Sequence, residues 1–558
     1  MRPLESLVAA SAIVVSSLPA AAQWGFVQDA RLTNPPGGTN QAFGKSVDIN
    51  GDTAVVGAPR GQTGVRGSVF VYTRSGSSWT QQAEVFALDH QTQDQFGYSV
   101  DLDGDTLVVG ANFHSLPGAQ ACGAAYVFVR NGATWTQQAK LVANDPEQQA
   151  EFGYDVALDG DTCAIGAPQS TSNNTLYAGA TYVFVRNGAT WSLQQRIVPN
   201  AAFSYIYGSR SGRAVALKGD SLLIGAPTSY DLAANVVFAG RAFEWIRSGS
   251  SWTQSAVITP TDTDEGRQFG CAIDYDGARA VFGAWAENAL PTGLQVGTAY
   301  VFRRAGGWVQ EQEIQPAGAD NADNYGTSVA IDGAVAAVGG INAASAGGMF
   351  SGCVKLFDFD GATWTERLTL DGSETSDSDR LGASVAIDGT VVIAGANNAN
   401  VAGSGFSGEA YVWDLDPPVI TTYCSAKTNS LGCLPVIGSS GVPSLSSAGA
   451  FHILATQVLN QKQGLLFYGY APAAAPFQGG HLCVQPPTRR LSAQNSGGSP
   501  AGSDCSGSYS YELNAYFQSG VDPVLVAGAF LYGQFWTRDP ASPSTTGLSG
   551  GVRAHLQP

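Results

Sequence analysis

A two-part motif recurs seven times along this chain at a nearly constant period. Each copy has an anchor residue followed by glycine, and a second glycine in a run of small residues lies 14 positions after the anchor. The anchors are Phe43, Phe96, Phe152, Ser211, Phe269, Tyr325 and Leu381, and the partner glycines are Gly57, Gly110, Gly166, Gly225, Gly283, Gly339 and Gly395. Successive anchors are 53 to 59 residues apart. This self-similarity predicts a repeat architecture, in which distinctive chemistry belongs to the loops that differ between repeats.

Each repeat has the pattern of two β-hairpins. In the second repeat, short apolar runs flank Asp103 and Gly104, and a further pair of runs flanks Asn131 and Gly132. Such pairs are the strongest short-range hairpin signal and favour a type I′ turn. No segment after the N-terminus shows sustained helical periodicity. The sequence therefore predicts four antiparallel strands per repeat, here called A to D.

Seven four-stranded units predict an all-β fold, a seven-bladed β-propeller. The last repeat stops after strand C, which ends near Asp414, and no Trp-initiated strand D follows. A segment of the strand D type occurs before the first repeat, from Trp24 to Leu32. We therefore expect this N-terminal strand to complete the seventh blade.

The paired motifs, Phe-Gly and Gly-Ala-Pro, resemble FG-GAP repeats, which are known from the propeller of integrin alpha subunits and from bacterial extracellular proteins. The resemblance covers residues 23–416. Three repeats keep the full Gly-Ala-Pro, which begins at Gly57, Gly166 and Gly225. Ser211 replaces the aromatic anchor in the fourth repeat. The resemblance implies the fold and does not by itself imply an activity.

Integrin-type repeats often bind calcium in an Asp-rich loop between strands A and B. Here that position holds a two-residue turn, whereas a calcium site needs six to eight oxygen ligands. Asp101, Asp103 and Asp105 flank one such turn and are expected to face solvent. We therefore expect no calcium in these turns and predict no cofactor.

The chain opens with the features of a secretory signal peptide. Arg2 precedes an apolar stretch from Leu7 to Leu18, and small residues precede Gln23. The apolar stretch is too short to span a membrane. We expect a signal peptide at residues 1–22, the propeller at 23–416, a linker at 417–423 and a C-terminal β-domain at 424–558. The mature protein is then secreted or at the cell surface, without a transmembrane segment and as a monomer.

The net charge of −17, with 28 Lys and Arg residues, argues against nucleic acid and anionic membranes as partners. Nucleic acids and anionic membranes bind preferentially to basic protein surfaces. The expected partner is an extracellular protein or a glycan.

The C-terminal region has no propeller repeat, and its apolar runs separated by Gly, Ser and Pro predict a small β-sandwich-like domain. The segments from Pro476 to Val484, from Asp504 to Gly507 and from Trp536 to Pro540 resemble a C-terminal module of other large secreted bacterial proteins.

The cysteines of this region are Cys424, Cys433, Cys483 and Cys505. In an exported domain four cysteines favour two disulfides with three alternative connectivities, and zinc is the competing interpretation. We expect the sequence-local pairing, Cys424 with Cys433 and Cys483 with Cys505. The propeller cysteines are expected to be buried small hydrophobic residues.

In an antiparallel blade the A–B and C–D turns lie at one end and the B–C and D–A connections at the other. The second set is longer and more variable, so any ligand is expected on that face, and its D–A connections are acidic. The candidate ligand contacts are Asp145, Asp264, Asp320 and Asp377 in D–A connections, and Trp285, which replaces the motif proline. The acidic residues of these connections are expected to form a solvated face that aids solubility, with a weak site for a cation or a basic partner as the functional alternative. The tryptophans that begin strand D (Trp79, Trp135, Trp191, Trp252, Trp308 and Trp364) are expected to pack between blades, with a sugar platform as the alternative.

No nucleophile elbow, metal-spaced histidine pair or phosphate loop is apparent. The sequence therefore favours an exported, non-enzymatic binding, adhesion or structural protein with no catalytic residues. The alternatives are a glycan-binding propeller (a lectin) and the non-catalytic domain of an enzyme that degrades extracellular polymers.

Overall fold

The structure of the chain is a computed structural model that describes residues 26–33, 41–60, 67–75, 78–172, 174–198, 208–230, 236, 238–262, 266–286, 288–289, 294–320, 322–345, 347–400, 406–415, 420–445, 449–526 and 529–556. Within these ranges the fold is nearly all-β, and α1 (Asn514–Gln518) is the only helix. No helix there is long and apolar enough to cross a membrane. Residue contacts separate two compact units, Val27–Asp414 and a unit that contains Leu415–Pro558.

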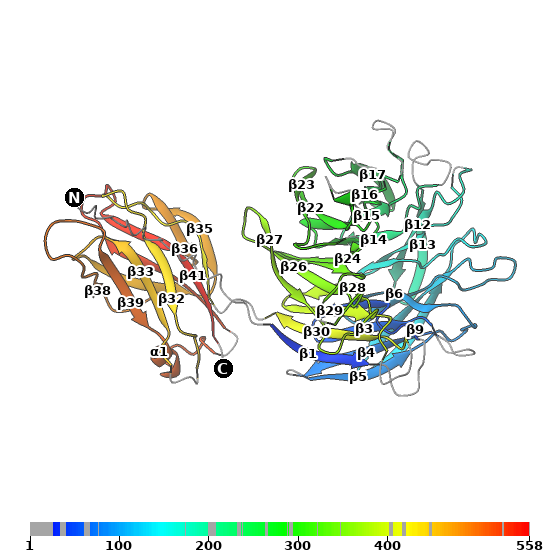
Figure 1. The fold of residues 1–558 in the computed structure, drawn as a ribbon, viewed down its shortest axis with the longest axis horizontal. Helices are drawn as coiled ribbons and strands as arrows, with labels where there is room; N and C mark the ends of the chain where they lie inside the picture. Colours follow the sequence, from blue (N-terminus) through cyan, green and yellow to red (C-terminus); the bar gives the residue numbers. More distant parts are fainter. Residues whose placement is uncertain are drawn as a thin grey trace, which may run out of the picture. The chain divides into compact units, whose positions relative to one another are not determined.

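Seven four-stranded sheets, here called blades 1 to 7, make up the first unit in the described ranges (Figure 1). In blades 1 to 6 the strands A to D follow one another along the chain as antiparallel neighbours. The strands of blades 1 and 2 are β2 (Ser46–Asn50), β3 (Thr53–Ala58), β4 (Ser68–Ser75), β5 (Ser78–Val85), β6 (Phe96–Asp103), β7 (Thr106–Ala111), β8 (Ala124–Asn131) and β9 (Thr134–Leu141). Those of blades 3 and 4 are β10 (Val156–Asp159), β11 (Thr162–Ala167), β12 (Ala180–Asn187), β13 (Thr190–Ile197), β14 (Ala214–Lys218), β15 (Ser221–Ala226), β16 (Arg241–Ser248) and β17 (Ser251–Ile258). Those of blades 5 and 6 are β18 (Ile273–Tyr275), β19 (Arg279–Ala284), β22 (Thr298–Arg304), β23 (Trp308–Ile314), β24 (Tyr325–Asp332), β25 (Val335–Gly340), β26 (Cys353–Phe359) and β27 (Trp364–Leu370). A short hairpin, β20 (Asn288–Ala289) with β21 (Leu294–Gln295), lies in the B–C connection of blade 5.

Blade 7 takes its outer strand from the other end of the propeller. It consists of β28 (Leu381–Asp388), β29 (Val391–Ala396), β30 (Glu409–Leu415) and β1 (Phe26–Thr33), which pairs with β30. Figure 1 shows β1, in dark blue, beside the yellow β30. This is the arrangement that the missing strand D of the last repeat predicts.

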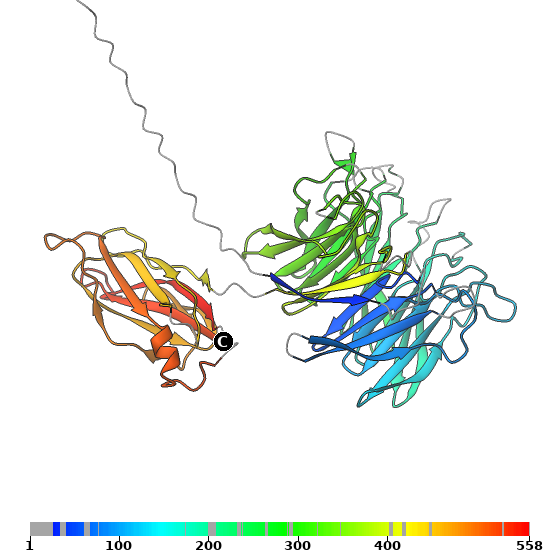
Figure 2. The same cartoon turned by 60° about the horizontal axis from the view of Figure 1, so that its bottom comes forward.

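The innermost strands, one from each blade, form a closed ring. Each strand A contacts strand A of the next blade in chain order, and β28 contacts β2. Figure 2, a second view of the same unit, shows the blades following one another around it. A β-propeller is therefore the fold of this unit, as the repeats predict.

The two halves of the repeat motif meet across the boundary between neighbouring blades. A Cβ added to Gly110 of blade 2 would lie 2.1 Å from the carbonyl oxygen of Gly153, the glycine that follows the anchor of blade 3. The equivalent distance is 1.9 to 2.3 Å at the other partner glycines. Gly153 itself has φ 86, a conformation that favours glycine. The motif is therefore a packing device that lets neighbouring backbones approach closely.

The A–B turns differ in one detail from the expected type I′ turn. In blade 2, Asp103 pairs with Thr106, so the two loop residues are Gly104 and Asp105. Of these residues only Gly104 has positive φ, at 57. Glycine at the first loop position with a single positive φ is the pattern of a type II′ turn, so the type I′ prediction was wrong. Because Asp103 is the last strand residue, its carboxylate can accept a hydrogen bond from Gly160 N of the next blade at 2.7 Å.

The second unit is a β-sandwich with a small added hairpin. One sheet has the order β31-β41-β40-β34-β37, with β38 also paired to β34, the second has the order β32-β33-β39, and the hairpin joins β35 to β36. The strands are β31 (Ile420–Tyr423), β32 (Val436–Ser440), β33 (His452–Val458), β34 (Gln463–Gly469), β35 (Pro472–Phe477), β36 (Gly480–Val484), β37 (Arg489–Arg490), β38 (Gln494–Asn495), β39 (Gly507–Glu512), β40 (Phe530–Arg538) and β41 (Thr546–His555). Side chains of both larger sheets, among them Ile453, Tyr509, Leu466 and Phe535, form one buried core.

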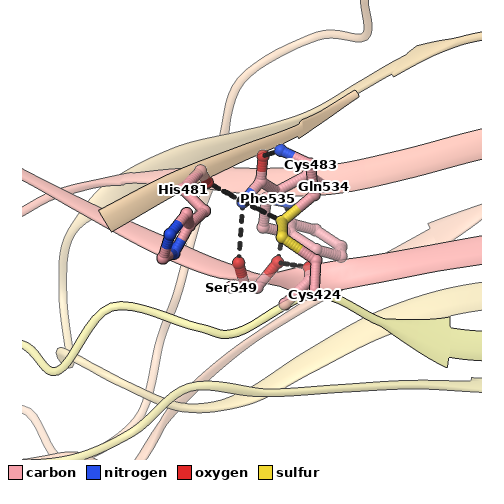
Figure 3. The surroundings of a disulfide bond; sticks show 7 residues. Cys424, His481, Cys483, Gln534, Phe535 and Ser549 are labelled. Atoms are coloured by element: carbon pink, nitrogen blue, oxygen red, sulfur yellow. Dashed lines mark hydrogen bonds between the residues drawn. A yellow bond between two sulfur atoms is a disulfide. The ribbon is translucent and has the colours of Figure 1, made fainter. Parts of the chain in front are cut away.

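Two disulfides are present, but their pairing is not the expected sequence-local one. Cys424 is bonded to Cys483, and Cys433 is bonded to Cys505. The reason is the topology, because the hairpin of β35 and β36 folds over the sheet that begins with β31 and brings Cys483 to Cys424 (Figure 3). Cys433 lies in a turn in which its backbone N–H donates a hydrogen bond to the Asn429 side chain at 3.0 Å. This turn places Cys433 next to Cys505.

Candidate functional site

The propeller has one face of short turns and one of long connections. In blade 2 the A–B and C–D turns have two residues each, whereas the B–C connection spans residues 112–123 and the preceding D–A connection spans 86–95. We call the first the turn face and the second the loop face. The residues predicted to contact a ligand belong to the loop face.

The predicted acidic contacts lie in the connections of different blades. Asp145, ahead of blade 3, accepts a hydrogen bond from the Tyr182 hydroxyl at 2.7 Å and pairs with Arg196 at 3.1 Å. Asp320 precedes blade 6 and is exposed, while Asp377 precedes blade 7 and accepts a hydrogen bond from Met349 N at 2.9 Å. Asp264 lies outside the described residues. The described members of this set therefore do not line one common pocket.

Other acids of the same connections are buried and hold the loops in shape. Asp94, Asp323 and Asp379 are 5%, 8% and 3% exposed. Each carboxylate accepts a hydrogen bond from the backbone N–H three residues earlier. Their backbone carbonyls accept hydrogen bonds from the B–C connection of the blade that follows. Some of the acidic residues that the sequence places on the loop face therefore stabilise its connections.

His114, for which the sequence shows no partner motif, is the centre of a buried polar chain. It is 1% exposed, and its ring lies 2.8 Å from Asp94 through Nδ1 and 2.8 Å from Lys140 Nζ through Nε2. Because an ammonium can only donate, Nε2 accepts and Nδ1 carries the proton that is donated to Asp94. Lys140 also binds Asp89 at 2.5 Å. This chain joins the D–A and B–C connections of blade 2.

Trp285 is half-buried on the loop face. Its indole N–H is buried and has no hydrogen-bond partner among the described residues. Its backbone carbonyl accepts a hydrogen bond from Asn324 Nδ2 at 3.4 Å. A ligand would therefore meet an edge of the ring rather than the N–H.

The tryptophans that begin strand D pack between blades. The Trp135 indole donates to Gln82 at 3.0 Å, and the Trp191 indole donates to Gln138 at 2.8 Å, so each bonds to the preceding blade. Arg130 and Arg186 lie over the two rings, with 5.3 and 5.2 Å between guanidinium carbon and ring centroid. These contacts leave little ring surface for a sugar.

A set of loop-face aromatics stands at one repeat position that the sequence analysis missed. We call Tyr177, Phe238, Phe350 and Phe406 the loop aromatics; each lies two residues before the glycine that precedes strand C. Tyr177, Phe350 and Phe406 are 42%, 45% and 54% exposed. The signal that could have found them is an aromatic, a small residue and glycine in four B–C connections.

The loop aromatics have a backbone conformation that bulky residues seldom adopt. Their φ values lie between 46 and 56. The carbonyl of Tyr177 accepts a hydrogen bond from Arg210 N of the next blade at 2.9 Å, and the carbonyl of Phe238 accepts one from Gln268 N at 3.0 Å. The same position in blade 2 holds Ala121 with φ 50. The fold therefore requires the backbone conformation here, but it does not require an aromatic side chain.

The seven A strands line two chambers, one toward each face, which we together call the axial channel. Its turn-face chamber has a volume of about 520 Å³ and its loop-face chamber about 240 Å³. The two chambers share a mostly apolar wall, to which Asp155 also belongs. Its apolar members stand at the fourth residue after the anchors and are Val47, Val100, Ile273, Val329 and Val385. The loop-face chamber holds Lys45, Tyr98, Tyr154 and Arg213, with Lys45 Nζ 4.4 Å from the Tyr98 ring centroid and the Arg213 guanidinium bonded to the Tyr154 hydroxyl.

The turn-face chamber is lined by half-buried carboxylates that bond to the next blade. Asp48 accepts from Leu102 N and Asp101 from Leu158 N, both at 2.6 Å, and Asp274 accepts from Ile331 N at 2.7 Å. Burial raises the pKa of Asp101 and of Asp274 to about 6.

Asp101 and Asp105, which flank the A–B turn of blade 2, were both predicted to face solvent, and this is wrong for Asp101. Asp101 lies in the channel rather than in solvent, because the strand directs it toward the axis. Asp105 is exposed and pairs with Arg130 at 2.6 Å.

In the described part of the chain, no three His, Cys, Asp or Glu side chains are grouped so that they could hold a metal ion. Six of the A–B turns in the described ranges have two residues, and that of blade 5 spans residues 276–278. In blade 2, Asp103 and Asp105 bond to a backbone N–H group and to arginine, respectively. The described residues therefore offer no calcium-binding loop at the position where integrin-type repeats have one.

The comparisons with known proteins identify the repeat. A family model described as FG-GAP repeat matches residues 26–72, 79–128, 135–184, 252–302, 308–357 and 364–413, which is more than half of the chain. Each match runs from a strand D to strand C of the following blade. The stretch 185–251 is not matched, although β14 to β16 form the same kind of sheet there. No curated protein matches the chain.

Proposed function

This chain belongs to the FG-GAP repeat family, and on that premise we propose that it is an exported, non-enzymatic binding protein. It attaches to an extracellular protein or glycan through the loop face of its propeller. The two disulfides of the C-terminal domain support export, because disulfides persist in oxidising compartments. The excess of acidic over basic residues in the propeller favours a neutral or basic partner surface for its loop face.

The loop aromatics carry this proposal. An exposed phenyl or phenol side chain at positive φ adds nothing to a buried core, and Ala121 fills the same backbone position. Residues in sparsely populated backbone conformations that also carry exposed apolar groups cluster at binding surfaces. Leu176 and Met349, which directly precede two of these aromatics, are 62% and 65% exposed. Together these side chains give the loop face an apolar character.

The polar groups of the loop face support a binding role better than a catalytic one. His114 is 1% exposed and both of its ring nitrogens are bonded, to Asp94 and to Lys140, so the imidazole faces no substrate. General acids and bases must lie within hydrogen-bond reach of the reacting atom. A detectable hydrolase activity of the purified protein on polysaccharide or peptide substrates would contradict this part of the proposal.

A glycan is the second candidate ligand, and the loop aromatics favour it as well. Flat aromatic rings held on a rigid backbone offer stacking surfaces, as in recognition sites that combine apolar walls with a few polar groups. A glycan array separates the two candidates, since a protein partner predicts no consistent glycan hits.

The test compares two variants with opposite expectations. We expect Tyr177→Ala, Phe350→Ala and Phe406→Ala together to reduce retention of the purified protein on the producing cells' envelope fraction about tenfold or more, since aromatic residues dominate binding energy. The matched control is the double variant Val257→Ala and Val309→Ala. These two valines lie on D strands, and they are 38% and 48% exposed. Equal retention of the two variants, both folded by circular dichroism, would contradict the loop face as the binding surface.

A further inference from the structure

The C-terminal domain contains a cleft of about 500 Å³ on the outer side of its larger sheet. Leu465 pairs with Trp536, and Phe467 pairs with Arg490 across the neighbouring strand. Because side chains alternate along a strand, these four lie on one face, opposite to the core residue Leu466. All four line the cleft. The outer face of the sheet is therefore an aromatic floor with one arginine at its edge.

The hairpin of β35 and β36 forms the opposite wall, and it is fixed at both ends. At one end the Cys424–Cys483 disulfide lies beside Gln534, which is 0% exposed (Figure 3). The Gln534 amide donates to His481 O at 2.9 Å and accepts from Cys483 N at 2.9 Å. At the other end Lys427 Nζ donates to Gln478 O at 2.8 Å. The cleft is therefore held open by bonds that do not depend on a ligand.

The charge on the described lining of the cleft is positive. Arg490 is exposed and, among the described residues, no group is hydrogen-bonded or ion-paired to its guanidinium. Its neighbour Arg489 points to the other side of the strand, where it pairs with Asp522 at 3.0 Å. None of the described lining residues is acidic. An unpaired guanidinium beside an apolar floor is complementary to a ligand that carries a carboxylate.

We propose that this cleft binds a glycan that contains uronic acid. A pyranose ring presents C–H groups on its face and hydroxyl groups at its edge. The Trp536 and Phe467 rings suit the face, and the side chains of Thr488 and Gln478 suit the hydroxyl groups. Arg490 supplies the paired N–H donors that a uronate carboxylate accepts. The volume suits a ligand of about two sugar rings, at the lower end of small-molecule sites.

The test is affinity electrophoresis of the full chain in gels that contain polygalacturonate. We expect retardation there, none in neutral β-1,4-galactan, and none with polyglutamate, a carboxylate polymer without sugar rings. Arg490→Ala and Trp536→Ala are each expected to weaken binding about tenfold or more, since a charge-assisted hydrogen bond exceeds the free energy of one decade in affinity. Arg490→Lys should retain part of the binding, because lysine keeps the charge but not the two-pronged geometry.

The matched control is Arg538→Ala, which removes an exposed arginine of β40 that does not line the cleft. Its retardation should equal that of the unchanged protein. If trimming Trp536 disturbs folding, the exposed Arg490 variants still decide the question. Unretarded native protein, equal retardation in galactan or polyglutamate, or equal behaviour of the Arg490→Ala and Arg538→Ala variants would overturn the proposal. The triple variant of the loop aromatics should bind polygalacturonate normally, so failure here is distinguishable from failure of the propeller's proposed role.

Discussion

The propeller and the C-terminal domain build β-sheets into a stable unit by different means. In the propeller, neighbouring blades are joined by close backbone packing at glycine, and its four cysteines are buried and unpaired. The C-terminal domain has no repeat and is crossed by two disulfides, with sequence separations of 59 and 72 residues. Repetition gives the larger unit many similar interfaces, whereas the smaller one relies on covalent links.

The difference follows from size and topology. A propeller blade contacts only its neighbours, so its stability is a sum of similar interface contributions, and closure of the ring removes the exposed ends. A small domain buries less apolar surface for its length, and disulfides offset this by limiting the unfolded chain. Changes to closure or to motif glycines should therefore affect only the propeller, and loss of disulfides only the C-terminal domain.

Removal of β1 should give the largest effect. Deleting residues 27–33 leaves β30 as an unpaired edge, removes Leu32 from a core that blades 1 and 7 share, and leaves Glu409, 1% exposed, without its partner Arg31. The pair is partly buried and Glu409 keeps the hydrogen bond from the Tyr411 hydroxyl, so loss of the ion pair costs less than the roughly 3–5 kcal/mol of a fully buried pair. We expect the propeller transition in calorimetry to fall by roughly 10 °C or more, while the C-terminal transition stays. Adding a peptide of residues 24–33 should restore part of the loss, and an unchanged propeller transition would contradict closure by β1.

The two kinds of propeller glycine should differ in their tolerance of alanine. A Cβ at Gly110 would lie 2.1 Å from a backbone oxygen of the next blade, whereas a Cβ at Gly104 meets nothing within 4 Å. We expect Gly110→Ala to lower the free energy of unfolding by roughly 3–5 kcal/mol through forced separation of the blades. Gly104→Ala should cost about 1 kcal/mol, the strain of positive φ. Urea titrations measure both, and equal losses would show that turn strain rather than blade packing explains the motif.

Loss of the Cys433–Cys505 disulfide should act on the other unit alone. The double change Cys433→Ala and Cys505→Ala removes a link across 72 residues. Such links stabilise by about 2–4 kcal/mol. We expect the C-terminal transition to fall by that amount and the propeller transition to stay. A fall in the propeller transition would mean that the two units do not unfold independently.

The repeats made the propeller predictable from sequence, because one motif fixed strand order, blade boundaries and the pairing of the N-terminal strand. The disulfide pairing was not predictable, since it depends on how the hairpin of β35 and β36 folds over β40 and β41, and spacing carries no such information.

The candidate sites were predicted only in part. Connection lengths predicted the loop face, but the loop aromatics were missed because the prediction rested on Trp285 and on acidic residues, not on a residue type that recurs at one B–C position. The role of Asp101 was misjudged because a turn pattern does not reveal which side of strand A faces the axis.

The smallest expected effect is a pH dependence confined to the propeller. Burial is the main cause that raises the pKa of Asp155 to about 7 from its ordinary value of 3.8. Asp101, Lys45, Arg213, Tyr98 and Tyr154 are the titratable neighbours around it. The native state therefore holds this proton more tightly than the unfolded state does, so the carboxyl stabilises the propeller fully below pH 4. That stabilisation is lost as pH rises to about 7.

Asp155→Asn keeps an oxygen acceptor for Val215 N, whose bond to the carboxylate is 2.8 Å. We expect the variant to match the unchanged protein at pH 4 and to be more stable at pH 8, with the difference building up between pH 4 and pH 7. Calorimetry across this range measures the difference, with the C-terminal transition as internal control. A variant that is less stable at pH 8 than the unchanged protein would show that the ionised carboxylate strengthens the channel instead.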